Sequence, residues 1–145
     1  MTANDMLLKE NLKSLRLPTM KSEYKKLADE ASAKSVGYED YLLTLTQSEL
    51  MERRAKAVER RIKAARFGVI KDLESYDFSA SPSLSKHAIL QMARCEWVTK
   101  QQNACLIGSP GTGKTHLATA IGLAACRMGF NVRFITAAAL TSQLE

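Results

Sequence analysis

The sequence predicts a mainly α-helical protein, in which an N-terminal helical bundle precedes the first part of an α/β domain with an incomplete parallel sheet. Three observations predict this fold class. Apolar residues recur at three- and four-residue spacing over most of the first 67 residues, as in amphipathic helices. A glycine-rich loop at residues 108–113 lies between a short apolar run and a further helical pattern. The composition shifts to serine, aspartate and proline near residues 70–84, so the predicted domains are residues 1–70 and 71–145.

Two short helices open the predicted bundle. The first covers residues 5–16, and the second begins at Thr19 or Ser22, after the break marked by Pro18, and ends before Gly37. Their apolar stripes are Leu8, Leu12 and Leu15 in the first helix and Met20, Tyr24, Leu27 and Ala31 in the second.

A longer helix is predicted for residues 39–67, a stretch without proline or glycine. Its first part, residues 41–45, is broadly apolar and is expected to pack in a core. Farther along, a narrow apolar face is expected from Met51, Ala55, Val58, Ile62 and Ala65. With the two shorter helices, this helix would complete a small bundle.

Basic residues cover most of the remaining surface of this long helix. Seven of them fall between residues 51 and 66, against two acidic residues, and the whole chain has a net charge of +6. They are Arg53, Arg54, Lys56, Arg60, Arg61, Lys63 and Arg66. On charge alone this basic face could bind the phosphate backbone of a nucleic acid, bind an acidic protein surface, or simply be solvated. Tyr24, Tyr38 and Tyr41 are expected in the core rather than as platforms for base stacking.

A connecting segment separates the two predicted domains. Residues 76–83 are rich in serine and also contain aspartate and proline, as is typical of a linker. Ser83 or Ser85 is expected to cap a helix that continues through Ile89 to Trp97.

The stretch GSPGTGKT, residues 108–115, matches the pattern of a phosphate-binding P-loop, or Walker A motif. Residues 103–107 are predicted to form a buried strand before it, and residues 116–127 a helix after it. Residues 130–135 are predicted to form a second strand, and residues 137–145 the start of the next helix. A strand, then the loop, then a helix is the context in which this pattern binds phosphate.

Each residue type in the loop has a physical role. Glycines at 108, 111 and 113 allow a backbone path in which successive N–H groups point at an anion, and the following helix adds the positive end of its dipole. Lys114 is expected to contact the β- and γ-phosphates of ATP, and the Thr115 hydroxyl to bind Mg²⁺. The predicted cofactor site comprises Gly108, Ser109, Pro110, Gly111, Thr112, Gly113, Lys114, Thr115 and His116. His116 is expected to pack or to form a hydrogen bond rather than to act as a base.

The composition excludes several other classes of protein. No apolar run approaches the roughly 20 residues that span a bilayer, and the N-terminal residues lack the features of a secretory signal. Cys95, Cys105 and Cys126 are too widely spaced for a metal site and are expected to be reduced and buried. A cytoplasmic protein that does not contact membranes is therefore predicted.

Several stretches together resemble the IstB-type transposition helper ATPases, which are AAA+ proteins related to the bacterial helicase loader DnaC. The resemblance spans nearly the whole chain and is most specific around the P-loop, which is followed by a distinctive run. The matching stretches are LRLPTM (15–20), YEDYL (38–42), RRIKAARF (60–67), DFSASPSL (77–84) and GSPGTGKTHLATAIGLAACRMGFNVRFITAAAL (108–140).

The resemblance implies an N-terminal helical domain that contacts the transposase or DNA, followed by an AAA+ module. It also implies that ATP binding drives the assembly of homo-oligomers on duplex DNA, and that the assembled helper regulates the transposase and the choice of target DNA. By this analogy the basic face of residues 53–66 would contact DNA or transposase. A role as a DnaC-like helicase loader stays open as the alternative.

Hydrolysis is not expected from these 145 residues. The family uses a Walker B carboxylate, sensor residues and an arginine finger, but Glu145 is the only acidic residue after Lys114. The sequence therefore resembles the front portion of a helper ATPase, truncated after the second strand. A non-enzymatic remnant that binds DNA or transposase is a further alternative.

Overall fold

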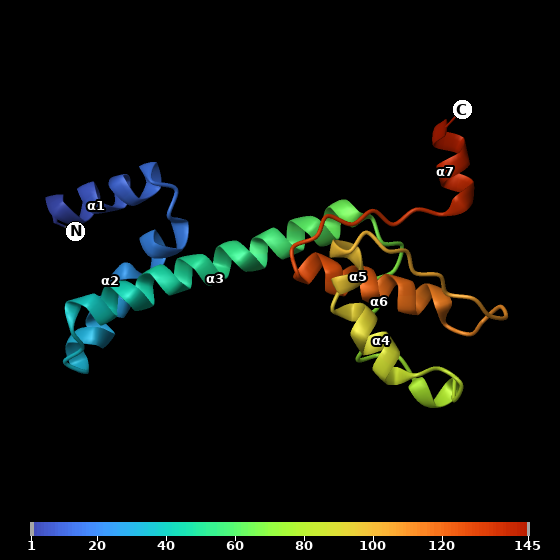
Figure 1. The fold of residues 1–145 in the computed structure, drawn as a ribbon. Helices are drawn as coiled ribbons and strands as arrows, with labels where there is room; N and C mark the ends of the chain where they lie inside the picture. Colours follow the sequence, from blue (N-terminus) through green and yellow to red (C-terminus); the bar gives the residue numbers. More distant parts are fainter. Residues whose placement is uncertain (1, 145) are drawn as a thin grey trace. The chain divides into compact units, whose positions relative to one another are not determined.

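The computed structural model describes residues 2–144, which form α-helices, one 3-10 helix and no β-strand (Figure 1). The helices of the N-terminal half are α1 (Ala3–Ser14), α2 (Pro18–Ala33) and α3 (Tyr38–Ala65). They are followed by the 3-10 helix η1 (Phe78–Ala80), α4 (Lys86–Ala93), α5 (Glu96–Thr99), α6 (Lys114–Arg127) and α7 (Ala137–Leu144). The mainly helical class predicted from the sequence is therefore confirmed.

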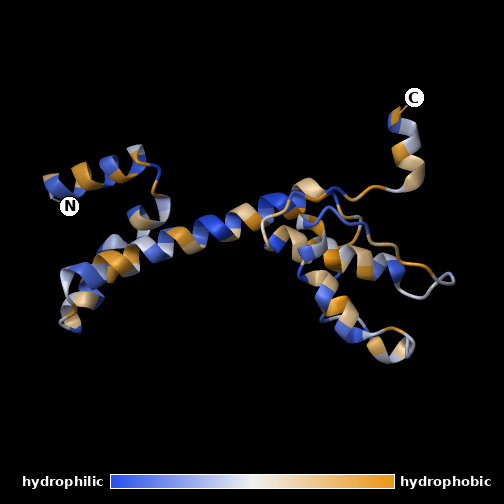
Figure 2. Cartoon of the chain, viewed as in Figure 1, coloured by the Kyte–Doolittle hydropathy of each residue, from blue (hydrophilic) through white to orange (hydrophobic). Residues whose placement is uncertain are grey.

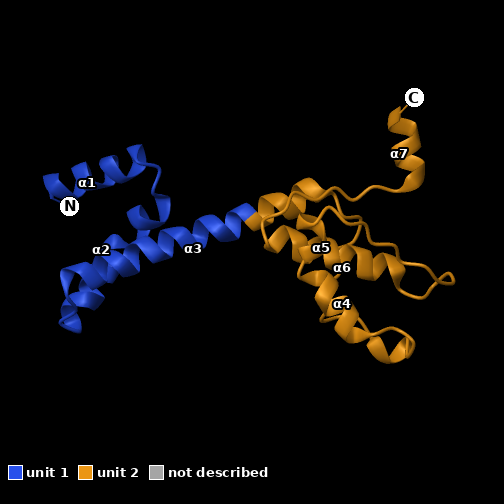
Figure 3. Ribbon diagram, viewed as in Figure 1, with its two compact units in different colours: residues 1–57 blue, residues 58–145 orange. Residues whose placement is uncertain are grey.

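Contacts divide the chain into two compact units, residues 1–57 and residues 58–145 (Figure 3). The division falls inside α3, so this helix contributes residues to both units. The serine-rich segment lies wholly within the second unit. The predicted boundary between residues 70 and 71 separates two domains with different expected functions, and it stays a prediction.

The first unit has a small core built from all three of its helices. Leu12 of α1, Tyr24 of α2 and Leu45 of α3 are its buried members. The Tyr24 hydroxyl donates a hydrogen bond to the Asp5 carboxylate at 2.7 Å, and this bond lowers the pKa of Asp5. The Tyr41 hydroxyl donates to the backbone carbonyl of Tyr24 at 2.9 Å, so two tyrosines tie the three helices together.

Several apolar side chains of α3 are more exposed than the sequence predicts. Leu42 and Leu43 are each 54% exposed, Met51 is 70% exposed and Tyr38 is 93% exposed. The expectations that residues 41–45 pack in a core and that Tyr38 is a core residue are therefore wrong for these side chains. Only one stripe of a helix can face a core built from three helices, and Leu45 occupies that stripe here. Figure 2 shows that apolar and polar residues alternate along α3.

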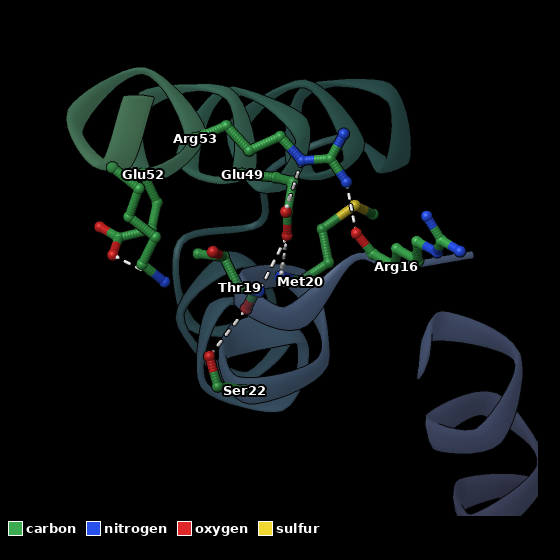
Figure 4. A network of polar contacts seen from close by, with 8 residues as sticks. Arg16, Thr19, Met20, Ser22, Glu49, Glu52 and Arg53 are labelled. Carbon is green, nitrogen blue, oxygen red and sulfur yellow. Dashed lines mark hydrogen bonds and ion pairs between the residues drawn. The ribbon is translucent and has the colours of Figure 1, made fainter. Parts of the chain in front are cut away.

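The start of α2 is capped by a side chain from α3 rather than by its own sequence (Figure 4). Leu17, the residue before the helix, has no capping side chain, and Pro18 occupies the first turn. The Glu49 carboxylate accepts hydrogen bonds from the backbone N–H groups of Thr19, at 2.8 Å, and Met20, at 3.0 Å. A negative charge thus lies at the positive end of α2, where helix N–H groups lack partners within the helix.

Burial and hydrogen bonding act in opposite directions on Glu49, which is only 3% exposed. Burial alone would raise the pKa of this carboxyl. The bonds from Met20, Arg53 and Thr19 outweigh burial, so the pKa of Glu49 is lowered overall. The charged form of Glu49 therefore stabilises the first unit.

In the second unit α6 carries most of the buried side chains. Leu117, Ile121 and Leu123 of α6 are buried, and α4, whose Ile89 is also buried, packs against this helix. The Ser85 hydroxyl accepts from the Ala88 N–H at 3.2 Å, which confirms Ser85 as the cap of α4. The helix expected to continue to Trp97 is interrupted at Cys95, which has a φ of +58° and separates α4 from α5.

The two strands of the expected parallel sheet are not formed in the described part of the chain. Residues 103–109 and 131–136 are in neither helix nor strand. Both segments border an apolar hollow of about 420 Å³ beside α6, with Leu106, Ile121 and Val132 in its lining. The Phe134 N–H donates instead to the carbonyl of Ala65 at the end of α3, at 2.8 Å. The prediction of an incomplete sheet is therefore corrected to two segments without strand pairing, and the one backbone N–H bond seen in the second segment goes to α3.

Candidate functional site

The P-loop residues form one exposed turn that leads directly into α6. Gly111 and Gly113 have φ values of +80° and +82°, a region that favours glycine. Gly113 is also the N-cap residue of α6, so the turn leads directly to the helix N-terminus. The first N–H groups of a helix have no carbonyl one turn earlier to donate to. The turn therefore presents backbone donors and the positive end of a 14-residue helix at the same place.

Lys114 folds back over this turn. Its ammonium group donates to the Ser109 carbonyl at 2.6 Å and lies 3.4 Å from the Thr112 hydroxyl. The Thr112 hydroxyl donates to the same Ser109 carbonyl at 2.8 Å. A phosphate group could take the place of these internal contacts, because an ammonium and a set of N–H groups are the donors that phosphate accepts. The donor set therefore fits the phosphates of a nucleotide.

The Thr115 side chain is exposed at the first turn of α6. Its hydroxyl offers one oxygen to a metal ion, and Mg²⁺ usually takes most of its ligands from phosphates and water. Among residues 2–144 no group of three histidine, cysteine or acidic side chains could hold a metal by itself.

A segment that the sequence analysis assigned to the linker packs against the start of α6. The Tyr76 hydroxyl donates to the Thr112 carbonyl at 3.3 Å, and the Tyr76 ring lies edge-on to the ring of His116, with 5.1 Å between centroids. His116 Nε2 lies 2.8 Å from the Asp72 carbonyl and 3.4 Å from the Ser75 hydroxyl. His116 thus packs and forms hydrogen bonds, as predicted. The residues in these contacts are 36 to 44 positions apart, so no local sequence pattern predicted that they would meet.

The basic residues predicted to bind nucleic acid lie on α3 and just beyond it. In the first unit they are Arg53, Arg54 and Lys56, all exposed. In the second unit Arg60, Lys63 and Arg66 are exposed, and Arg61 is half-buried. An exposed position leaves these side chains accessible to a polyanion. Their role stays a prediction.

Arg53 and Lys56 already have acidic partners within α3. The Arg53 Nε donates to Glu49 at 3.0 Å, and its guanidinium also donates to the backbone carbonyl of Arg16, after the end of α1 (Figure 4). Lys56 lies 3.2 Å from Glu52. Arg53 therefore has a structural role that the charge pattern alone did not predict.

The cysteines are partly as expected. All three are free thiols, and Cys95 and Cys126 are buried, which raises the pKa of each thiol. Cys105 is exposed, so the expectation that all three are buried is wrong for this residue. It lies in the segment that was expected to form a buried strand.

Among the described residues, every helix is too short or too polar to span a lipid bilayer.

Comparison with known proteins identifies relatives along nearly the full length of this chain. An ATP-binding protein named for insertion sequence IS5376 of Geobacillus stearothermophilus is 33% identical over 131 residues, which cover 90% of this chain and 52% of that protein. An insertion-sequence ATP-binding protein of Sinorhizobium fredii is 36% identical over 135 residues, covering 92% of this chain and 45% of that protein. An ATP-binding protein named for insertion sequence IS21 of Pseudomonas aeruginosa is 32% identical over 124 residues, which cover 86% of this chain and 47% of that protein.

The chain spans about half the length of these curated relatives. The sequence pattern of a family described as "IstB-like ATP binding protein" matches residues 10–145, which include the end of α1, the whole of α2 and α3, the P-loop and α6. The resemblance seen in the sequence is thereby confirmed. The chain belongs to the family of IstB-like ATP binding proteins.

Proposed function

We propose that this chain binds ATP together with Mg²⁺ at residues 108–116 and serves as a helper protein of DNA transposition. The observation that carries the nucleotide site is the turn with Gly111 and Gly113 at positive φ, which leads into α6 beside the Lys114 ammonium. Lys114 would contact the β- and γ-phosphates, and Thr115 would hold Mg²⁺. The bound metal would neutralise phosphate charge. The names of the insertion-sequence relatives support the wider role.

We further propose that these 145 residues bind the nucleotide without appreciable turnover. Hydrolysis requires groups that position the metal and the attacking water, and a P-loop alone provides affinity for phosphate. Only one acidic residue, Glu145, follows Lys114 in this sequence. A DnaC-like helicase loader remains the alternative in the ATPase class, and a remnant that binds DNA or transposase remains the alternative without nucleotide.

Titration of the chain with a fluorescent ATP analogue and Mg²⁺ is expected to give saturable binding. Unlabelled ATP and inorganic tripolyphosphate are both expected to displace the analogue, since the cradle recognises phosphates. Phosphate release over the same period is expected to equal that of a blank without protein. If the analogue shows no saturable binding, the nucleotide site is refuted. If phosphate is released well above the blank, the claim that these residues do not hydrolyse ATP is refuted.

Duplex DNA and transposase are proposed as partners, and assembly into homo-oligomers is proposed for the protein in its family role. The support for DNA is the set of exposed cations in the second unit, Arg60, Lys63 and Arg66. Each Lys or Arg that neutralises a phosphate releases counterions, so binding should weaken steeply as salt increases. This dependence does not require a particular DNA sequence.

Replacing Arg60, Lys63 and Arg66 together by glutamine is expected to weaken duplex DNA binding and to flatten its salt dependence. If all three contact phosphates, the slope of log K against log salt should fall by about 2 to 3. Fluorescence anisotropy with a labelled duplex at several salt concentrations measures both quantities. The matched control replaces three exposed lysines outside α3, Lys34, Lys71 and Lys100. An equal loss in this control would show that net charge, and not the basic face, governs binding.

A further inference from the structure

Tyr76 touches the P-loop at Gly113, the residue that precedes α6. A Cβ atom placed on Gly113 would lie 2.8 Å from Tyr76 Cε2 and 3.1 Å from its hydroxyl oxygen, so the ring occupies the space that a side chain at position 113 would need. The hydroxyl donates to the carbonyl of Thr112, at 3.3 Å. Tyr76 therefore contacts both residues joined by the 112–113 peptide bond.

The position of this hydroxyl has a consequence for the neighbouring N–H group. In a planar trans peptide the carbonyl and the following N–H point in opposite directions. The contact with Tyr76 fixes the direction of the Thr112 carbonyl. It thereby favours the peptide orientation in which the N–H of Gly113 points away from Tyr76, so that this ring does not compete with a phosphate group for it.

The segment that carries Tyr76 is itself attached to α6 by a second contact. His116, on the first turn of the helix, lies 2.8 Å through Nε2 from the Asp72 carbonyl. The Asp72 carboxylate accepts from the Ser75 N–H at 2.9 Å and closes the turn between these residues. Phe78 lies edge-on to Tyr76, with 4.8 Å between ring centroids. The Tyr76 ring therefore contacts two other rings, those of Phe78 and His116.

We propose that Tyr76 is a positioning residue of the nucleotide site, which orients the Thr112–Gly113 peptide so that the Gly113 N–H is directed into the phosphate cradle. This inference rests on the proposed binding of nucleotide at residues 108–116. It assigns to the segment of residues 72–78 a role in phosphate binding that its linker-like composition does not suggest. The ligand that Tyr76 influences is the phosphate chain and not the base.

Two substitutions separate the contributions of the hydroxyl and the ring. Tyr76→Phe removes only the hydroxyl, whose bond is long, and is expected to weaken binding of both ATP and tripolyphosphate by the same two- to fivefold factor. Tyr76→Leu also removes the ring beside Gly113 and is expected to weaken both further. Tyr38→Phe is the matched control, because Tyr38 is 93% exposed. Calorimetric titration gives the affinities, and thermal unfolding shows whether each variant remains folded.

The outcomes distinguish this proposal from other roles of Tyr76. A loss of affinity for ATP with unchanged affinity for tripolyphosphate would place Tyr76 at the base and overturn the proposal. Unchanged affinity for both ligands in Tyr76→Phe and Tyr76→Leu would also overturn it. A fall in both affinities at an unchanged unfolding temperature would support it.

A measurement without nucleotide keeps the inference separate from the proposed function. In a ¹H–¹⁵N spectrum of the ligand-free chain, Tyr76→Phe is expected to shift the Gly113 and Lys114 amide resonances, whereas Tyr38→Phe leaves them in place. Unchanged resonances at these two residues would overturn the positioning role even if the chain binds no nucleotide. Shifted resonances in a chain that binds no nucleotide would refute the proposed function but support the peptide orientation.

Discussion

Replacing Lys114 by alanine is expected to lower the affinity of this chain for ATP by roughly ten- to a hundredfold. The reason is the loss of the charged donor at the phosphate cradle, since hydrogen bonds that involve a charged group contribute about 1.5–3 kcal/mol each. In the free chain this ammonium bonds to the Ser109 carbonyl in an exposed turn, where water can replace it. The free energy of unfolding should therefore change by less than about 0.5 kcal/mol.

The separation of affinity from stability makes this variant informative. Competition titration against the fluorescent analogue gives the affinity, and chemical unfolding followed by circular dichroism gives the stability. Lys100→Ala is the control, because Lys100 is an exposed lysine outside the P-loop. If Lys114→Ala binds ATP as tightly as the unchanged chain, Lys114 does not contact the phosphates and the proposed site is wrong.

Glu49→Gln is expected to destabilise the first unit by about 1.5–3 kcal/mol. The substitution removes the negative charge that accepts from the Thr19 and Met20 N–H groups and from Arg53. A three-helix unit with a core of a few side chains has a small free energy of unfolding. A loss of this size is therefore expected to increase local unfolding of the unit measurably. Hydrogen–deuterium exchange of peptides from residues 17–27 reports directly on the amides that Glu49 accepts from.

Glu52→Gln provides a close control for Glu49→Gln. Both acids lie on α3 and pair with a basic residue one turn later, but Glu52 is exposed and its partner is the exposed Lys56. Exposed ion pairs contribute about 0–1 kcal/mol, so the change should be small. Equal effects of the two substitutions would show that the capping of α2 by Glu49 contributes little.

The same carboxyl predicts a pH dependence of stability. Because the pKa of Glu49 is lowered in the folded chain, its contribution is complete above its unfolded pKa of about 4.3. The contribution is lost as the pH falls from that value through the folded pKa. Glu49→Gln should therefore remove part of the acid destabilisation below about pH 4.3, and stability curves of the two proteins should converge there.

The helices could be predicted from the sequence because local chemistry sets their ends. Ser85, one of two predicted caps, precedes α4, and α6 begins at Lys114, two residues before the predicted start at residue 116. The strands could not be predicted correctly in the same way. A strand requires partners on another segment, and the apolar composition of residues 103–107 does not specify any.

In the candidate site, too, local features could be predicted from the sequence and long-range contacts could not. The P-loop pattern is contiguous, so the sequence predicted its residues and the helix behind them, and the structure brings them together in one turn. Tyr76 and Glu49 were missed because their contacts join residues about 30 or more positions apart. The residue types did not indicate these roles either. A tyrosine is ordinary in a serine-rich linker, and a glutamate near arginines is ordinary on a solvated helix.

The passage of α3 through both compact units limits how the protein can be divided into pieces. A fragment that stops at residue 57 would cut the helix in its middle and leave its last four carbonyls without their donors. It would also remove residues 58–65, which carry Val58, Ile62 and the fully buried Ala65. An N-terminal piece intended for study in isolation should therefore extend through the natural end of α3, near Arg66.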